Sequence, residues 1–440
     1  MKKFSLPPLV EANPSNRVKQ TDYGNLPLLQ KLMIAVARAW ERPFYRKHWG
    51  FDSLDDVLNT IHAGGFESLP IVRKSHLRDD FENVVDFNDA GDLVSSSGTT
   101  GRPVDMPVHF RQEEGRVLRV RRLLRELGVR PGTKVLQLLS LNDMFTLGVL
   151  AWQAIKAEGA TAIRCSPARI DRVLDAIKYN KPEFVIGNPY VLARMADEAG
   201  EKWPDVSLLP KKAFLAVAAT FTTDLQKTPI AQKVIEKWGL THWLNQYGTS
   251  ELGPVAYEES DHQGLRIHDD FHYVELINPD TGKPVSEGQP GEVVVTGLTF
   301  PRGLLPVRYG TGDIAAWLKN ENGKWLMGPI IGRIDHQLKV YGQTVFPNLL
   351  LNLVDGVPGI RRAVVTSHKD EIKGDDVRIL CAAKDPSESE AIRQKVLRLC
   401  NQNLAVSPEV EMVDFEVIKQ LEQKVTSKTN GSKVPRFFRL

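Results

Sequence analysis

Short runs of apolar and β-branched residues alternate with longer amphipathic stretches along the middle of this chain. Lys134–Ser140, Thr161–Arg164 and Glu183–Ile186 are such short runs, and they are predicted to be strands. Met144–Glu158 and Ala168–Lys178, which lie between them, have apolar residues at helical spacing. This β-α-β-α-β order predicts a parallel sheet, because parallel neighbours need a crossover connection.

The pattern continues towards the C-terminus and then changes. Ala213–Ala219 and Thr241–Gln246 are predicted to be strands, with a helix over Asp224–Trp238 between them. From Tyr273 onwards the apolar runs become shorter and turn residues separate them, which predicts a small β-rich subdomain. Further predicted elements are the helices Leu28–Trp40, Gln112–Gly128 and Ser387–Leu404 and the strands Val274–Ile277, Glu292–Thr296, Ala363–Ser367 and Val377–Ala383.

A chain of 440 residues is too long for one compact core. The expected fold class is α/β, with a large N-terminal domain over residues 1–332 that combines layered parallel sheets and helices with the β-rich subdomain. Residues 333–440 are expected to form a small α+β domain, because the last strands and helix follow one another there.

Composition narrows the class of protein. With 42% hydrophobic and 25% charged residues, the chain resembles soluble globular proteins. The formal charge is only +3, so the chain lacks the excess of basic residues that is typical of nucleic-acid-binding proteins. Polar residues interrupt the most apolar long window, so no membrane span is expected. The three cysteines are scattered without metal-ligand spacing, which is typical of a reduced cytoplasmic protein and predicts no structural zinc.

The segment Ser95–Pro103 carries the strongest chemical signal. It contains five hydroxyl side chains, two glycines and Arg102 within nine residues. Glycine allows backbone N–H groups to approach an oxyanion, and hydroxyl groups donate hydrogen bonds from the side, so the composition suits phosphate. The segment is not a Walker A loop. Taken alone, such a run is also typical of a mobile linker.

Four further segments follow in a specific order. They are Tyr247–Glu251, Arg308–Asp313, Gly332–Asp335 and Gly431–Arg436, each with glycine next to a hydroxyl or charged residue. Together with Ser96–Pro103, this series resembles the adenylate-forming superfamily of acyl-CoA synthetases, amide-forming ligases and luciferases. Gly342–Pro347, which reads Gly-Gln-Thr-Val-Phe-Pro, resembles the signature of the phenylacetate–CoA ligase branch in particular.

This resemblance implies that the protein activates a carboxylic acid with ATP and Mg²⁺. Tyr247 would pack on adenine, and the backbone and hydroxyl groups of Gly248, Thr249 and Ser250 would complete the nucleotide site. Glu251 would act in catalysis as the Mg²⁺ ligand, since this ion prefers carboxylate and phosphate oxygens. The residues implied to hold the β- and γ-phosphates are Ser96, Ser97, Gly98, Thr99, Thr100 and Gly101.

The resemblance also implies roles for the end of the chain. Asp313 would accept hydrogen bonds from the ribose hydroxyls, and Arg333 would reach the ribose or the α-phosphate. Lys433 would be the catalytic lysine, which bridges the attacking carboxylate and the α-phosphate. Because Lys433 belongs to residues 333–440, that domain is expected to be a mobile lid that pivots at Asp335.

The acid pocket is expected next to the nucleotide site. Phe145, Trp152, Tyr190 and Phe214 would form a flat apolar slot, which favours an aromatic or arylacetic monocarboxylic acid; plain core packing is an equal alternative for each of them. Asn188, Ala218 and Asn245 are further candidate lining residues.

The function stays open between three hypotheses, of which the first two differ in the acceptor of the acyl group. Coenzyme A is the first, because of the branch resemblance. An amine or a carrier-protein thiol is the second, because Tyr341 replaces a common arginine and no CoA-binding motif is readable. A non-catalytic nucleotide-binding relative is the third, because Ala216–Thr220 lacks the acidic turn usual in the superfamily. His268 is interpreted as structural or pocket-lining, and a homodimer is one assembly that the resemblance allows.

Overall fold

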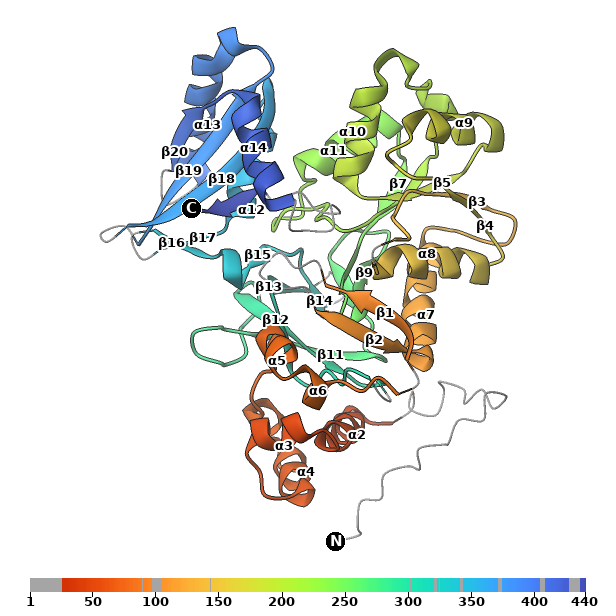
Figure 1. Ribbon diagram of the computed structural model, residues 1–440, viewed down its shortest axis with the longest axis vertical. Helices are drawn as coiled ribbons and strands as arrows, with labels where there is room; N and C mark the ends of the chain where they lie inside the picture. The colour runs from red at the N-terminus through yellow and green to blue at the C-terminus, as the bar shows by residue number, and fades with distance from the viewer. Residues whose placement is uncertain are drawn as a thin grey trace.

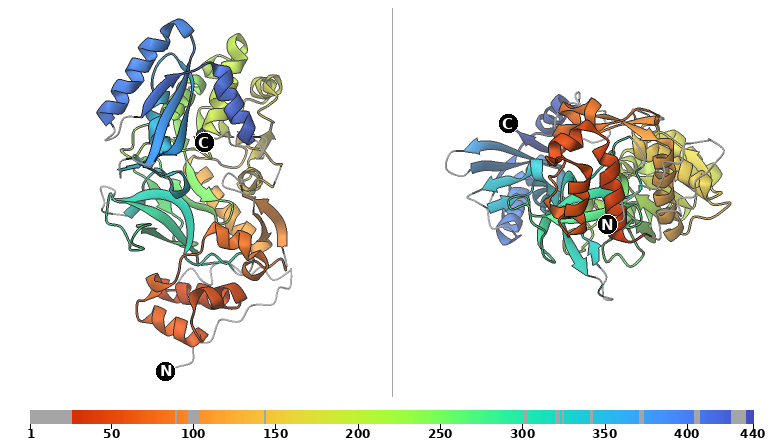
Figure 2. Two further views of the ribbon diagram at one scale, coloured as in Figure 1. Left: turned by 60° about the vertical axis from the view of Figure 1, so that its left-hand side comes forward. Right: turned by 90° about the horizontal axis from the view of Figure 1, so that it is seen from below.

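The structure is a computed structural model. It describes residues 26–88, 90–96, 104–142, 144–300, 303–319, 323, 325–340, 343–370, 374–403, 408–426 and 436–440. Figure 1 shows three large parts above a group of N-terminal helices: a parallel sheet with its helices, a β-rich part, and a C-terminal part. Two turned views place the N-terminal helices at the end of the molecule remote from the C-terminal part (Figure 2).

The N-terminal helices pack against the β-rich part. They are α2 (Leu28–Trp40), α3 (Pro43–Trp49), α4 (Leu54–His62), α5 (Lys74–Asp79) and α6 (Phe81–Val84). Apolar residues of these helices share one hydrophobic core with β11, β12 and β13. A parallel bridge between Val72 and Tyr309 continues this contact, so that α5 begins beside β13.

A five-stranded parallel sheet follows in the order β4-β3-β5-β6-β7. Its connections are helical, and their residues shield both faces of the sheet in two separate hydrophobic cores. The strands are β3 (Lys134–Gln137), β4 (Thr161–Arg164), β5 (Phe184–Gly187), β6 (Lys212–Leu215) and β7 (His242–Leu244), and the helices are α7 (Phe110–Glu126), α8 (Thr146–Ala157), α9 (Ile170–Asn180), α10 (Pro189–Ala199) and α11 (Pro229–Trp238). The predicted parallel sheet is therefore confirmed.

The β-rich part is one antiparallel sheet in the order β11-β12-β13-β14-β10-β9-β8, and β15 pairs with β13. A separate antiparallel hairpin, β1 (Ala90–Ser95) and β2 (Asp105–His109), carries the segment between residues 96 and 104 at its turn. The strands of the large sheet are β8 (Gln246–Thr249), β9 (Gly253–Glu258), β10 (Leu265–Ile267), β11 (His272–Ile277), β12 (Pro290–Gly297), β13 (Tyr309–Lys319), β14 (Trp325–Met327) and β15 (Gly332–Arg333).

The C-terminal part has its own sheet and its own core. Its sheet has the order β17-β16-β19-β18-β21, with β20 on β19, and helices α12 and α13 pack into its main hydrophobic cluster. Its elements are β16 (Leu338–Val340), β17 (Gln343–Val345), α12 (Pro347–Asp355), β18 (Ile360–Asp370), β19 (Gly374–Ala383), α13 (Ser389–Asn403), β20 (Glu409–Met412), α14 (Phe415–Thr426) and β21 (Phe437–Arg439). In Figure 1 this part lies beside α10 and α11, and α12 contacts α11.

Several predicted elements have different boundaries; the helix predicted over Asp224–Trp238, for example, begins at Pro229. Two of the differences coincide with a positive φ. The strand predicted over Ala213–Ala219 ends at Leu215, because Val217 adopts a left-handed conformation with φ of 69°. The helix predicted from Met144 begins at Thr146, since Met144 also has a positive φ of 55°. Both residues lie in loops that follow the carboxyl ends of strands of the parallel sheet. Ligands usually bind at this end of such sheets.

Candidate active site

Three predicted nucleotide-binding residues meet in one hydrogen-bonded cluster. The Tyr247 hydroxyl on β8 donates to Asp313 Oδ2 on β13 at 2.9 Å, and Arg333 Nη1 on β15 donates to Asp313 Oδ1 at 2.8 Å. Asp313 and Arg333 are direct partners across the antiparallel pair β13–β15. Gly312 makes this approach possible, because its φ of +76° favours glycine and a Cβ there would lie 3.1 Å from Arg333 Nη2.

The cluster is polar, ionic and largely buried. Burial and the neighbouring Asp313 carboxylate raise the pKa of Tyr247 well above its ordinary value, so the phenol stays protonated. Burial alone would lower the pKa of Arg333, but the carboxylates of Asp313 and Asp335 raise it overall. The two Asp313 oxygens accept hydrogen bonds from Tyr247 and Arg333. A carboxylate oxygen can accept more than one hydrogen bond, which recognition of a vicinal diol requires.

Glu251 lies at the end of the turn after β8 and is 5% exposed. Although burial alone would raise the pKa of this carboxyl, the Lys74 ammonium and local hydrogen bonds hold it below its ordinary value. Lys74 Nζ at the start of α5 lies 3.4 Å from Glu251 Oε1. A buried ionised carboxylate that lines a cavity fits the hard oxygen ligand that Mg²⁺ requires, with phosphate oxygens and water as the remaining ligands.

Helix α7 holds the backbone of that turn from behind. Arg116 Nη1 and Nη2 donate to the carbonyls of Ser250 and Glu251 at 3.0 and 2.9 Å. Arg119 Nη2 donates to the carbonyl of Leu252 at 3.1 Å. Both guanidinium groups are buried, and they satisfy carbonyls that would otherwise be buried without partners. The turn that carries Gly248, Thr249, Ser250 and Glu251 is therefore fixed by a helix distant in sequence.

Most of the predicted phosphate loop, residues 97–103, lies outside the described residues, and so does Lys433. The two ends of the loop are described. Ser96 Oγ accepts from the N–H of Val104 at 2.9 Å, which closes the hairpin below the loop. The Ser250 hydroxyl donates to the Ser95 carbonyl at 3.1 Å. The loop therefore begins and ends beside the turn that carries Glu251.

A cavity of about 2020 Å³ connects these groups. It extends from Glu251 and Asp313 past the edge of the parallel sheet to Arg436 and Phe437 of the C-terminal part. Asp335, the predicted hinge, lies just beyond Arg333 in a short 3₁₀ turn, and the two side chains form an ion pair at 3.5 Å. All five candidate acid-pocket residues line the cavity: Phe145, Asn188, Tyr190, Ala218 and Asn245.

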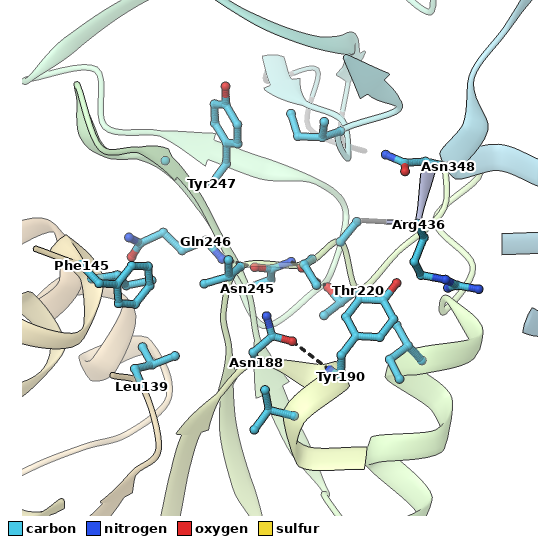
Figure 3. Close-up of a pocket in the computed structure, with 18 of the residues that line it drawn as sticks. Leu139, Phe145, Asn188, Tyr190, Thr220, Asn245, Gln246, Tyr247, Asn348 and Arg436 are labelled. Carbon is cyan, nitrogen blue, oxygen red and sulfur yellow. Dashed lines mark hydrogen bonds between the residues drawn. The ribbon is translucent and has the colours of Figure 1, made fainter. Parts of the chain in front are cut away.

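Two residues expected in an apolar slot are placed elsewhere. Phe214 is fully buried in the core between the sheet and its helices, because β6 is covered on both faces. Trp152 packs under the side chains of Lys156 and Arg164 on the outer side of α8. Neither ring lines the cavity, and Phe214 follows the alternative of core packing. Figure 3 shows instead that amide side chains, those of Asn188, Asn245 and Gln246, lie between Phe145 and Tyr190.

A buried carboxyl group organises the loop where the superfamily usually has an acidic turn. Asn245 Nδ2 donates to the Ala218 carbonyl at 2.7 Å and to Thr220 Oγ1 at 3.2 Å. The Glu258 carboxyl accepts from the N–H of Asn245 at 2.7 Å and from the Thr220 hydroxyl at 3.3 Å. Burial raises the pKa of Glu258 to about 8.

Sequence reasoning missed Glu258, Lys74 and Arg116. None of the three belongs to a glycine-rich motif, and each reaches the site from another element of the fold. Local sequence therefore offered no signal for Lys74 or Arg116. Glu258 has a weak signal, since it is an acidic residue at the end of an otherwise apolar strand.

His268 lies outside the cavity, stacked on Tyr257 with ring centroids 4.7 Å apart. Burial and nearby arginines lower its pKa to about 2, so it is neutral. The described part of the chain holds no group of three or more His, Cys, Asp or Glu residues that could bind a metal ion. It also holds no helix long and apolar enough to cross a membrane.

Comparison with known proteins agrees with this geometry. The family described as AMP-binding enzyme matches residues 86–305, which is half of the chain. Phenylacetate-coenzyme A ligase of Thermus thermophilus is 29% identical over 352 residues, which cover 75% of each chain. Crystal structures of 2-hydroxyisobutyryl-CoA ligase share the fold over 91% of both chains, with TM-scores of 0.75 for the postadenylation state at 19% identity and 0.62 for the thioesterification state at 21% identity. This chain belongs to the family of AMP-binding enzymes.

Proposed function

We propose that this protein is an AMP-forming acid–CoA ligase. The observation that carries the proposal is the juxtaposition of Tyr247, Asp313 and Arg333 with Glu251 along one cavity, which continues past Phe145, Asn188 and Tyr190. The similarity to phenylacetate-coenzyme A ligases supports an acid as the first substrate and coenzyme A as the acceptor.

The reaction has two steps. A carboxylate oxygen of the acid attacks the α-phosphorus of ATP, the bond to the β-phosphate oxygen breaks, and pyrophosphate leaves. The thiol sulfur of coenzyme A then attacks the acyl carbon, the thiol proton is lost, and AMP leaves. In our proposal Asp313 orients the ribose and Tyr247 borders the base, while the loop over residues 96–101 holds the leaving pyrophosphate. Glu251 would hold Mg²⁺, whose charge offsets that of the phosphates.

The C-terminal part is proposed to act as the lid. Residues 333–440 would bring Lys433 to the α-phosphate for the first step and remove it for the second, with Asp335 as the pivot. The ion pair between Arg333 and Asp335 and the pair between Arg333 and Asp313 both lie where this lid would join the rest of the chain.

The direct test is acid-dependent ATP–pyrophosphate exchange, followed by mass spectrometry of the product with CoA. Formation of an acyl-CoA thioester is expected. If exchange occurs but the acyl group passes only to an amine or to a carrier-protein thiol, the acceptor in our proposal is wrong. If no acid supports exchange, the protein is a non-catalytic relative instead.

Replacement of Lys433 by alanine tests the division of labour between the two steps. We expect K433A to slow adenylation by about a hundredfold or more, because it removes a charge that acts on the α-phosphate. The reaction of a supplied acyl-adenylate with CoA should change by less than about threefold. Lys419→Ala, which alters an exposed lysine on α14, is the matched control. Equal loss in both half-reactions would contradict the lid proposal.

A further inference from the structure

Glu292 on β12 is fully buried, and it lies next to the strand that carries Asp313. Its Oε1 atom accepts a hydrogen bond from Arg73 Nη1 and a second one from the Gly312 N–H at 3.2 Å. Arg73 directly precedes Lys74, at the start of α5. Gly312 directly precedes Asp313. One oxygen atom therefore joins the two segments that carry these candidate nucleotide-binding groups.

Asp313 lies in an irregular part of the β-rich sheet. The register of β12 and β13 shifts between Glu292 and Val294, so that one residue of β12 lies opposite three residues of β13, of which Asp313 is the last. Such bulges re-aim a side chain and disrupt the ladder of backbone hydrogen bonds. Side chains serve as acceptors here, since the Gly312 N–H donates to Glu292 and the Asp313 N–H donates to Thr311 Oγ1 at 3.1 Å. Glu292 is therefore one of two side chains that hold the backbone of this bulge.

The absence of a side chain at Gly310 leaves room for the pair of Arg73 and Glu292. A Cβ atom at this position would lie 2.5 Å from Glu292 Oε1 and 2.6 Å from Arg73 Nη1. The φ of Gly310 is outside the left-handed region, so glycine is needed there for space and not for backbone conformation. A larger residue would force the two side chains to move.

The Glu292 carboxylate is costly to bury. Burial raises the pKa of this carboxyl, and the Arg73 guanidinium opposes that rise. A buried ion pair adds little net stability compared with apolar side chains of similar volume, so the geometry that it fixes explains its presence better. Here that geometry is the position of Asp313 relative to Lys74.

We propose that Glu292 is a positioning residue for nucleotide recognition, which holds the bulge with Asp313 in the geometry that the ribose hydroxyls require. The proposal rests on the nucleotide site of the function proposed above, and it adds a residue that acts through Asp313. Without Glu292 the Gly312 N–H loses its acceptor, and Asp313 loses its alignment. The tie through Arg73 to Lys74 is lost at the same time.

The test measures how strongly the protein distinguishes the ribose hydroxyls, because a merely structural role would not change this preference. The dissociation constants of MgATP and of the magnesium complexes of 2′-deoxy-ATP and 3′-deoxy-ATP are determined by isothermal titration calorimetry, without an acid. For the unmodified protein we expect at least one deoxynucleotide to bind about tenfold more weakly than ATP, since a hydrogen bond to a carboxylate is lost. Glu292→Leu should reduce this ratio to below about threefold.

Glu292→Gln is the conservative variant. It keeps an oxygen that can accept from the Gly312 N–H, so its ratio should lie between those of E292L and the unmodified protein. Glu275→Gln is the matched control, because Glu275 is a buried carboxylate of the same sheet and pairs with Arg308. The ratio should persist in E275Q. Thermal unfolding of each variant establishes that the titrated protein is folded.

An unchanged ratio in folded E292L would overturn the role of Glu292. If E292L does not fold, an intermediate ratio in E292Q supports the proposal and an unchanged ratio overturns it. Failure of the unmodified protein to bind ATP, or equal binding of all three nucleotides, would overturn it as well. Absence of ATP–pyrophosphate exchange with any acid would instead overturn the ligase function, and the binding test would still apply.

Discussion

At the scale of single residues, the Lys74–Glu251 pair adds a charge to the nucleotide site that the motifs do not contain. Lys74 lines the cavity next to the candidate Mg²⁺ ligand. Lys74→Met removes this positive charge from the region where the triphosphate would lie. We expect KM for MgATP to rise about tenfold while KM for the acid changes little. Lys47→Met, at an exposed position of α3, is the control for loss of a lysine elsewhere. An unchanged KM for MgATP would show that Lys74 has no contact with the nucleotide.

The buried Glu258 carboxyl is expected to make the stability of the folded protein depend on pH. Its pKa is raised by burial to about 8, against about 4.3 in an unfolded chain. Between these values the folded protein holds a proton that the unfolded chain has lost, so Glu258 lowers stability progressively as pH rises from about 4 to about 8. Glu258→Gln does not titrate; its Oε1 can still accept from the Asn245 N–H, while its Nε2 would donate to Thr220 Oγ1. The melting temperature of E258Q relative to the unmodified protein should therefore be higher at pH 8 than at pH 5. Burial lowers the pKa of the neighbouring His262, whose Nδ1 lies 3.9 Å from Glu258.

The opposite trend would contradict this assignment. If E258Q loses stability relative to the unmodified protein as pH rises to 8, Glu258 is ionised in the folded state and contributes as a carboxylate. Thr220→Val is a useful companion, because it removes one hydrogen bond to Glu258 without changing the charge.

Single residues also show how much of the candidate site could be predicted from the sequence. Tyr247, Asp313 and Arg333 belong to motifs of fixed spacing, and the structure brings them together as expected. Phe214 was misplaced because a strand of a parallel sheet is apolar on both faces, so periodicity does not tell which face meets a ligand. Lys74 could not be found, since contacts between segments far apart in sequence, such as the bridge between Val72 and Tyr309, bring it to the site.

At the scale of elements, helix α7 acts as the support of the turn that carries Glu251. Arg116 binds two successive carbonyls, which a lysine cannot do with the same geometry. Arg116→Lys is expected to reduce the free energy of unfolding by about 1–3 kcal/mol, because one buried carbonyl loses its partner. KM for MgATP should rise in parallel, as the turn becomes less ordered.

Arg125→Lys is the matched control for this prediction. Arg125 lies on the same helix, is half-exposed and pairs with Glu158. Urea unfolding monitored by tryptophan fluorescence should show little change for R125K. If both variants behave alike, the support of the turn by α7 is not specific to Arg116. The sequence predicts a helix over Gln112–Gly128, yet the carbonyls that its arginines bind come from residues 133 to 135 positions away.

At the scale of the whole molecule, a contact joins the acid pocket to the C-terminal part. Arg436 forms a bidentate pair with Asp355, both bonds at 2.6 Å. The Tyr190 side chain at the start of α10 lies near Arg436 and helps to raise the pKa of that guanidinium group, and Figure 3 shows the Tyr190 ring directed towards Arg436. This contact links helix α10, beside the parallel sheet, to the C-terminal part of the molecule.

Tyr190→Phe removes this link and little else. One of the two half-reactions takes place with the C-terminal part placed as in this structure, and we expect Y190F to slow that half-reaction by about threefold to tenfold. The other half-reaction should change less. Separate assays of pyrophosphate exchange and of thioester formation from a supplied adenylate measure the two. Tyr179→Phe, at a position that is 70% exposed, is the control. Equal effects on both half-reactions would mean that Tyr190 acts only through the acid pocket.

The parallel sheet was predictable at this scale, because its strands follow one another with helices between them. The large antiparallel sheet was not. Most of its neighbouring strands are consecutive in sequence, but its order depends on the pairing of β10 with β14, which joins the run β8-β9-β10 to the run β11-β12-β13-β14. Short apolar runs indicate strands there, but they carry no information on which edges meet.

The pairing of β13 with β15 has a consequence for the order in which substrates act. Asp313 contacts Arg333, and Arg333 is the residue from which the chain enters the C-terminal part. A ribose that hydrogen-bonds to Asp313 shares this carboxylate with Arg333, and so weakens the Arg333–Asp313 ion pair beside the two-residue strand that leads into the proposed lid. Rotation would then become easier only after the first substrate has arrived. We therefore expect an obligatory sequence in kinetics, with nucleotide before thiol, and product-inhibition patterns should reveal it.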